Sequence, residues 1–170
     1  MMKRLSALLL ALALCLTCVS ALAEENALVV DAPEGSGYAY EQLGIAITVP
    51  DELVQTDVSK EDAALGAFDM FMAKDGSKMI QFRISDPGAD FDPQAYFDSL
   101  KETEGVVDPE VGTINGISWI TYSTTDNQMV AVTNVGELYL TAIAMPMDDN
   151  DFVMTFAQVL GSIASYTPAE

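Results

Sequence analysis

Apolar and polar residues alternate at strand spacing from residue 38 onward. Tyr38–Gln42 and Ile45–Val49 read as two short strands, the second with Ile45, Ile47 and Val49 on one face. Pro50-Asp51 ends this pattern, and residues 57–64 are polar enough for a loop or a single helical turn.

Residues 68–85 predict an antiparallel hairpin, because two β-favouring runs flank Asp75-Gly76, a dipeptide whose residues suit the positive φ angles of tight hairpin turns. The apolar residues of this hairpin fall on both of its faces. One face is expected to carry Ile80, Phe82 and Ile84, and the other Phe68, Met70 and Met72. A sheet that is apolar on both faces must be covered on both sides.

Three further strands are predicted at 116–124, 128–134 and 138–145, with connections at 125–127 and 135–137 that are short enough for hairpins. The last of them, LYLTAIAM, is apolar on both faces, which is typical of a central strand.

Two helices are predicted as the covers. Asp92 can cap the first helix, Pro93 suits its first position and Gly105 can end it, with Tyr96, Phe97 and Leu100 as the buried stripe. The second helix is expected at about 151–164, with an apolar side that comprises Phe152, Phe156, Val159, Leu160 and Ile163. Gly161 within it costs roughly 1 kcal/mol relative to alanine, which close packing against the sheet would explain.

This order of elements predicts a single α+β domain over residues 38–166, followed by a short tail, 167–170. We expect a mostly antiparallel sheet of about six strands sandwiched between helices. The segments GIAITVPDEL, DPQAYFDSL, NGISWITYS and LYLTAIAMP…DFVMTFAQVLGSI also resemble the Mog1/PsbP-like fold, in particular its small secreted bacterial members. The resemblance spans roughly residues 38–166 and implies an α/β/α arrangement. The branches of this family do unrelated work, and no motif here allows a functional residue to be transferred.

The first 23 residues have the organisation of a bacterial secretory signal. Lys3 and Arg4 precede an apolar run, and Ala21-Leu22-Ala23 offers small residues for cleavage before Glu24. The alternative is an uncleaved anchor, but the run is shorter than the ~20 residues of a spanning helix. After cleavage we expect no membrane span, a flexible leader at 24–37 in which residues 28–30 can form a brief strand, and a protein that is secreted or associated with the cell envelope.

Both cysteines, Cys15 and Cys18, lie in the signal, so the mature chain would contain no disulfide, although a lipid anchor at one of them is an open alternative. The whole chain has 7 basic and 26 acidic residues, and removal of Lys3 and Arg4 leaves 5 against 26, a net charge of −21. Such a surface argues against binding to nucleic acid. The acidity also fits a simple role in solubility.

Two acidic clusters are candidates for calcium sites. Asp148, Asp149, Asn150 and Asp151 are consecutive and include no glycine turn, which favours a helix start capped by Asp149 or Asn150. The second cluster, Asp86, Asp90 and Asp92, has better spacing and includes Gly88, so a weak calcium site there is an alternative to a turn followed by a helix cap.

Of the five cations in the mature chain, Lys74, Lys78 and Arg83 fall within ten residues of one another. Together they would form a positive patch for an anionic partner, an unknown protein or an envelope component. The alternative is that they balance nearby carboxylates and discourage edge pairing. Trp119 and the tyrosines could line a ligand groove or belong to the core.

The sequence excludes several kinds of catalysis. It has no histidine, which rules out serine–histidine and cysteine–histidine mechanisms and histidine-ligated zinc, and it has no phosphate-binding glycine loop. We expect no cofactor. The leading hypothesis is therefore a secreted, non-catalytic binding or accessory domain, and the alternative is an extracellular glycan hydrolase that uses a pair of carboxylates.

Overall fold

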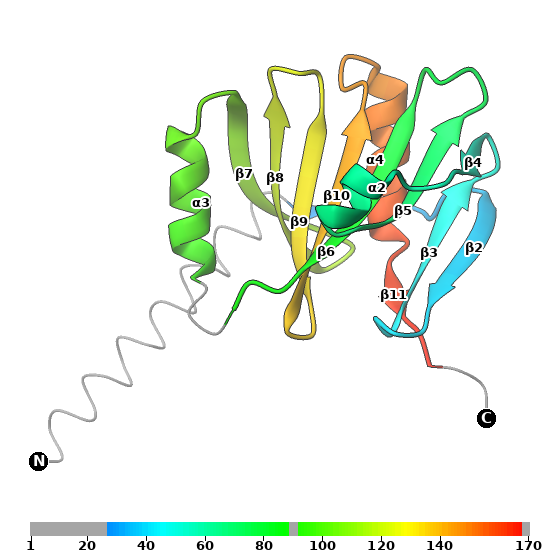
Figure 1. The fold of residues 1–170 in the computed structure, drawn as a ribbon, viewed down its shortest axis with the longest axis horizontal. Helices are drawn as coiled ribbons and strands as arrows, with labels where there is room; N and C mark the ends of the chain where they lie inside the picture. The colour runs from blue at the N-terminus through cyan, green and yellow to red at the C-terminus, as the bar shows by residue number, and fades with distance from the viewer. Residues whose placement is uncertain (1–26, 89–91, 168–170) are drawn as a thin grey trace, which may run out of the picture.

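The computed structural model describes residues 27–88 and 92–167, which form two sheets and three helices (Figure 1). The strands are β1 (Ala27–Leu28), β2 (Gly35–Tyr40), β3 (Ile45–Pro50), β4 (Leu53–Gln55), β5 (Ala67–Ala73), β6 (Met79–Ser85), β7 (Val106–Ile114), β8 (Ile117–Thr124), β9 (Met129–Val135), β10 (Leu138–Met145) and β11 (Ala164–Ser165). The helices are α2 (Lys60–Ala64), α3 (Pro93–Glu102) and α4 (Asn150–Gly161). In these two ranges, no helix is both long enough and apolar enough to span a membrane.

The larger sheet has eight strands in the order β1-β7-β8-β9-β10-β6-β5-β4, and a separate sheet has the order β11-β3-β2. The α+β class is confirmed, but the expected sheet of about six strands was too small. The sequence missed β4 and β7, and the strand pair β2–β3 belongs to the second sheet. All neighbours in the large sheet are antiparallel except β1 and β7, and β10 lies in its interior, as its two apolar faces predicted.

The hairpin predicted at residues 68–85 is confirmed as β5 and β6. Its connection is longer than a two-residue turn, and of the Asp-Gly pair only Gly76 has a positive φ, of 73°. The Asp75 carboxylate instead accepts hydrogen bonds from the Ser77 backbone N–H and hydroxyl, at 3.0 and 2.6 Å. Phe68 departs from its predicted face, because the register shifts between Ala67 and Asp69.

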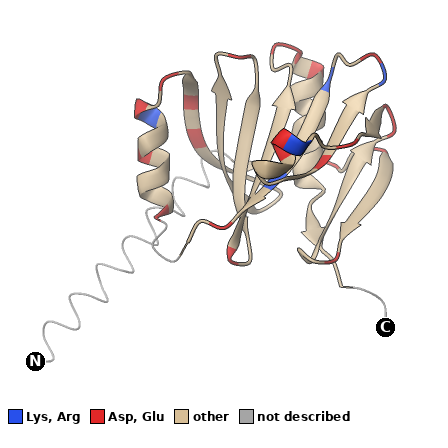
Figure 2. Ribbon diagram, viewed as in Figure 1, with Lys and Arg blue, Asp and Glu red and all other residues tan. Residues whose placement is uncertain are grey.

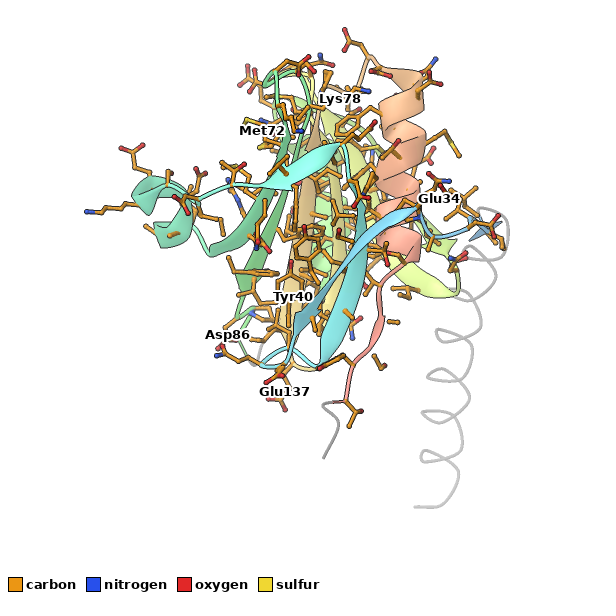
Figure 3. All side chains as sticks on the ribbon, turned by 90° about the vertical axis from the view of Figure 1, so that its right-hand side faces the viewer. Glu34, Tyr40, Met72, Lys78, Asp86 and Glu137 are labelled. Atoms are coloured by element: carbon orange, nitrogen blue, oxygen red, sulfur yellow. The ribbon has the colours of Figure 1, made fainter. Side chains whose placement is uncertain are left out.

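Both predicted covering helices are confirmed, with the predicted caps. Asp92 accepts from the N–H groups of Gln94 and Ala95 at the start of α3, and Asp149 accepts from that of Phe152 at 3.0 Å at the start of α4. In Figure 3, α2 and α4 lie on opposite sides of the large sheet, so both faces carry a cover.

The main core lies between the large sheet, α4 and the β2–β3 pair. Its largest buried side chains include Trp119, Phe71, Phe82, Phe152 and Phe156. Phe68 packs on this core too, with its ring 5.1 Å from that of Tyr40. One of the two covers is therefore a helix together with a small sheet, rather than helices alone.

Residues 27–37 hold β1 and the beginning of β2, although the sequence suggested a leader there. The Val30 N–H donates to the Asn115 side-chain oxygen at 3.0 Å, and the Asn115 amide donates to the carbonyls of Val30 and Gly161, both at 2.8 Å. A Cβ atom on Gly161 would lie 2.5 Å from Val30 Cγ2. Close packing thus accounts for glycine in α4, and it involves the N-terminal segment as well as the turn after β7.

Candidate functional site

The three predicted patch cations do not lie together. Lys78 contacts α4, where its Nζ is 3.1 Å from Asp149 Oδ2 and 5.3 Å from the centre of the Phe152 ring (Figure 3). Arg83 contacts α2 on the other face of the sheet, with its Nη2 3.2 Å from Asp62 Oδ1. Lys74 is exposed in the hairpin connection.

Basic positions are accordingly separated along the fold in Figure 2. An anionic partner that used this hairpin would have to compete with Asp149 for Lys78 and with Asp62 for Arg83. The partner-binding role of these cations stays a prediction, and the geometry favours ion pairs that fix the two helices to the sheet.

The acidic clusters have structural roles where the structure describes them. Asp149 caps α4, and its carboxyl pKa is lowered first by the Phe152 N–H and then by Lys78. Asp86 accepts from the Gly88 N–H at 2.8 Å within a turn, and Asp92 caps α3. Asp90 lies outside the described residues. In the described ranges, no three acidic side chains converge as metal ligands.

A buried polar cluster joins β2 to the large sheet around Asp69, which is 4% exposed. Its carboxylate accepts from the Tyr40 hydroxyl at 2.5 Å, from Gln55 Nε2 at 3.0 Å and from the Met70 N–H at 2.8 Å. Burial, and next the Asp69 carboxylate, raise the pKa of the Tyr40 hydroxyl. Every contact of this carboxylate is an internal donor, so the cluster serves to dock the small sheet and does not present a reactive group.

The face of the sheet opposite α4 is covered at its centre by tyrosines. Tyr96 of α3, Tyr122 of β8 and Tyr139 of β10 pack over Val130, Val132 and Ile143. Burial raises the pKa of the Tyr122 hydroxyl, with a smaller contribution from Tyr96.

Beside this layer, a groove of about 370 Å³ lies between the first turn of α3 and the sheet. Its walls include Phe97, Ile120, Asn134 and Tyr139, and Asp92 at its rim is already engaged as the helix cap.

A second groove, here called the α4 groove, lies between α4 and the core-facing side of β7 and β8. Its apolar end has a volume of about 200 Å³ and is lined by Leu28, Ile114, Trp119, Met129, Met154, Phe156 and Leu160, among others. Its polar end has a volume of about 300 Å³ and includes Asp108, Glu110 and Asn150. The two ends share Glu110, Thr121, Met129 and Val153, so they form one continuous groove.

Trp119 gives the α4 groove its most unusual property. The side chain is 1% exposed, and its indole N–H is buried without a hydrogen-bond partner. Across the described residues, the Thr124 hydroxyl is the other buried side-chain group in this condition. Unpaired buried donors are few in native proteins and each calls for an explanation.

The sequence pointed to part of this groove and missed the rest. The sequence leaves Trp119 open as a groove residue or a core residue, and it is both: it is buried, and it borders the α4 groove as well as the groove beside α3. Asp108 and Glu110 drew no attention because β7 was not expected. The signal available was the alternation of Glu110, Gly112 and Ile114 on one side of a strand, which Pro109 obscured.

Comparison with known proteins supports the fold. No protein-family model matches the sequence, and no curated protein matches it. The solution structure of cyanobacterial PsbP (CyanoP) from Synechocystis sp. PCC 6803 superposes with a TM-score of 0.54 at 15% identity, over 77% of this chain and 92% of that one.

Two other solved structures align at TM-scores below 0.5. A Bacteroides thetaiotaomicron VPI-5482 protein gives 0.49 at 11% identity, over 81% of this chain and 50% of that one. LpqN, involved in cell envelope biogenesis of Mycobacterium tuberculosis, gives 0.43 at 16% identity, over 81% and 90%. The resemblance seen in the sequence is confirmed at the level of architecture, and this chain has a PsbP-like, Mog1/PsbP-type fold.

Proposed function

We propose that this protein is an exported, non-catalytic accessory protein that binds a small, largely apolar ligand in the α4 groove. The observation that carries the proposal is the unpaired indole N–H of Trp119 in a wall of an open apolar groove. Binding sites typically combine apolar walls with a small number of polar groups that orient the ligand. In the α4 groove, the polar groups are those of Trp119, Thr121 and Glu110, and the other walls are mostly apolar.

The energetics favour a ligand over an empty groove. A buried donor without a partner costs about 1–3 kcal/mol, and an acceptor on a ligand that reached this N–H after a shift of the surrounding side chains would recover part of that cost. The apolar walls would add about 25 cal/mol for each Å² of apolar surface removed from water. Met129 and Met154 line the groove with flexible side chains that can adjust to a ligand.

Export rests on the N-terminal sequence. The charged start, the apolar run and Ala21-Leu22-Ala23 support cleavage before Glu24 and work outside the cytoplasm or at the cell envelope. Mass spectrometry of the protein recovered from cells and medium tests this. We expect a chain that begins at Glu24, and a cytoplasmic protein that retains Met1 or Met2 would contradict export.

The groove is tested with a neutral fluorophore that has a single ring, methyl anthranilate, added to residues 24–170. Because Trp119 is the single tryptophan of the chain, energy transfer to the probe has one tryptophan donor, and the groove variant below shows where the probe binds. We expect saturable transfer in the wild type. Ala157→Leu, which fills the groove, should abolish it, whereas Ala63→Leu on the exposed surface of α2 should not.

Three results would reverse these conclusions. Saturable binding that is equal in the wild type and in Ala157→Leu would place the ligand elsewhere, and no saturable binding would remove the proposal. Turnover in a glycan panel that disappears in Glu110→Gln would favour the alternative, a carboxylate-dependent hydrolase.

A further inference from the structure

We infer that the ligand of the α4 groove is a small organic cation, an ammonium group attached to a short alkyl chain or a single ring. This inference rests on the proposed function and adds the charge and the size of the ligand. Two observations carry it. One end of the groove is apolar and the other is acidic, and none of the described ion pairs involves the acidic end.

The acidic end is built by β7. Asp108 and Glu110 both line it and are both exposed. The described ion pairs are Lys78–Asp149, Arg83–Asp62 and Lys101–Asp98, and none of them includes Asp108 or Glu110. The two carboxylates are therefore open to a cation from outside the chain.

A break in the strand accompanies these two acids. The pairing of β7 with β8 shifts register between Val107 and Glu110, and Asp108 has a φ of 47°, in the left-handed region. Bulges of this kind occur often at sheet edges beside binding sites, where they re-aim side chains. Glu110 lines both the acidic and the apolar ends, so it marks where the charged part of a ligand would meet its apolar part.

The size of the groove limits the ligand. The apolar end, at about 200 Å³, is smaller than the roughly 300–1,000 Å³ of pockets that enclose drug-sized molecules. A short chain or one ring is therefore the largest apolar group that fits without rearrangement. A bare metal ion is disfavoured, because calcium needs six to eight oxygens and no three acidic side chains converge in the described ranges.

The net charge of the whole chain also favours a positively charged ligand. Its formal net charge is −19, which attracts small cations over long range and repels anions. That attraction has no preferred position, however, so a test must separate the field of the whole protein from the two local carboxylates.

The experiment compares three six-carbon probes that differ in their polar end: hexylammonium, hexanol and hexanoate, each titrated at pH 7 into residues 24–170. Trp119 emission and NMR amide shifts report binding. We expect hexylammonium to bind more tightly than hexanol by on the order of fivefold, the upper range for an exposed ion pair, and hexanoate to bind least. Because the Debye length falls from about 10 Å to about 3 Å between 0.1 and 1 M salt, the preference should shrink at high salt.

Charge variants locate the preference. Asp108→Asn with Glu110→Gln should lower the affinity for hexylammonium until it equals the affinity of the same variant for hexanol. Glu137→Gln, which removes a charge in the β9–β10 connection away from the groove, should leave both affinities unchanged.

Each other result has a definite meaning. Equal binding of hexylammonium and hexanol would overturn the cation inference and leave the proposed function standing. The local site would be overturned if the preference for hexylammonium survived the double substitution, or if Glu137→Gln reduced it equally. Either result would assign the preference to the electrostatic field of the whole protein. If none of the probes perturbs Trp119 or the groove amides, both the inference and the proposed function fail.

Discussion

Replacement of Asp69 by alanine should destabilise the protein strongly, because this carboxylate holds the small sheet on the large one. It is 4% exposed and accepts from Tyr40 at 2.5 Å, from Gln55 at 3.0 Å and from the Met70 N–H at 2.8 Å. A hydrogen bond to a charged group contributes about 1.5–3 kcal/mol. Gln55 is exposed and can return to water, so its bond contributes least.

The Tyr40 bond should dominate the effect. We expect Asp69→Ala to lower the free energy of unfolding by about 3–4 kcal/mol, since it leaves the Tyr40 hydroxyl and the Met70 N–H without their acceptor. The domain should still fold, because domains of this kind have stabilities of about 5–15 kcal/mol. Asp69→Asn should cost less, because an amide retains one acceptor and the right shape.

A double-mutant cycle with Tyr40→Phe isolates the pair. Urea unfolding of residues 24–170, followed by the emission of the buried Trp119, gives each free energy. We expect a coupling of at least about 1.5 kcal/mol between Asp69→Ala and Tyr40→Phe. As a control, Asp51→Ala removes an exposed carboxylate on the same strand pair, which accepts from Ser36 at 2.8 Å, and should cost under about 0.5 kcal/mol.

The reasoning would be refuted by a coupling below about 0.5 kcal/mol, which is the value for independent sites. It would also be refuted if Asp69→Ala cost no more than Asp51→Ala. The first result would mean that the bond between Tyr40 and Asp69 contributes little to stability, and the second that burial of the carboxylate costs as much as its hydrogen bonds contribute.

Two further substitutions probe the attachment of α4. Gly161→Ala should lower stability by about 1 kcal/mol despite the better helix propensity of alanine, because the new Cβ would lie 2.5 Å from Val30 Cγ2. Val30→Ala should relieve that clash when it is combined with Gly161→Ala. Urea unfolding measures the stabilities, and a Gly161→Ala variant that is more stable than the wild type would contradict the packing. The Phe152 N–H, and then Lys78, lower the pKa of the Asp149 carboxyl. Asp149→Asn should therefore destabilise the protein at pH 7, but not at a pH below that lowered pKa. The contribution of such a carboxylate is full above its unfolded pKa, near 3.9, and is lost as the pH falls through the folded value. Chemical denaturation from pH 7 to pH 2 should therefore show wild-type and variant stabilities converging at the acid end, and a constant difference would count against the assignment.

The periodic parts of the sequence were predictable because local chemistry determined them. Leu138–Met145 is apolar on both faces and forms an interior strand. Asp92-Pro93 and Asp149 begin helices because their side chains satisfy free N–H groups wherever the helix packs.

The missed elements depended on context. Pro109 argues against a strand interior, and β7 accommodates it next to the register shift between Val107 and Glu110. Asp69 lies in an apolar run, and its hydroxyl partner, Tyr40, is 29 residues away, so no local pattern shows the bond. Lys78 and Arg83 are close in sequence, but Lys78 lies in the connection just before β6 and Arg83 within β6, and they contact helices on opposite faces of the sheet, which proximity alone does not reveal.

The position of α4 explains why the groove beside it is a stable feature. At its start, Asp149 is bound to Lys78 at 3.1 Å, and just after its end the Ser162 hydroxyl accepts from the Thr48 N–H at 2.9 Å. Both contacts hold the helix to one part of the molecule, on β3 and at the start of β6, while the groove runs along its other side, over β7 and β8. Sliding of the helix to close the groove would break contacts at both ends. A ligand of the kind proposed would therefore be accommodated by side chains such as Met129 rather than by motion of the helix, as in a preformed binding site.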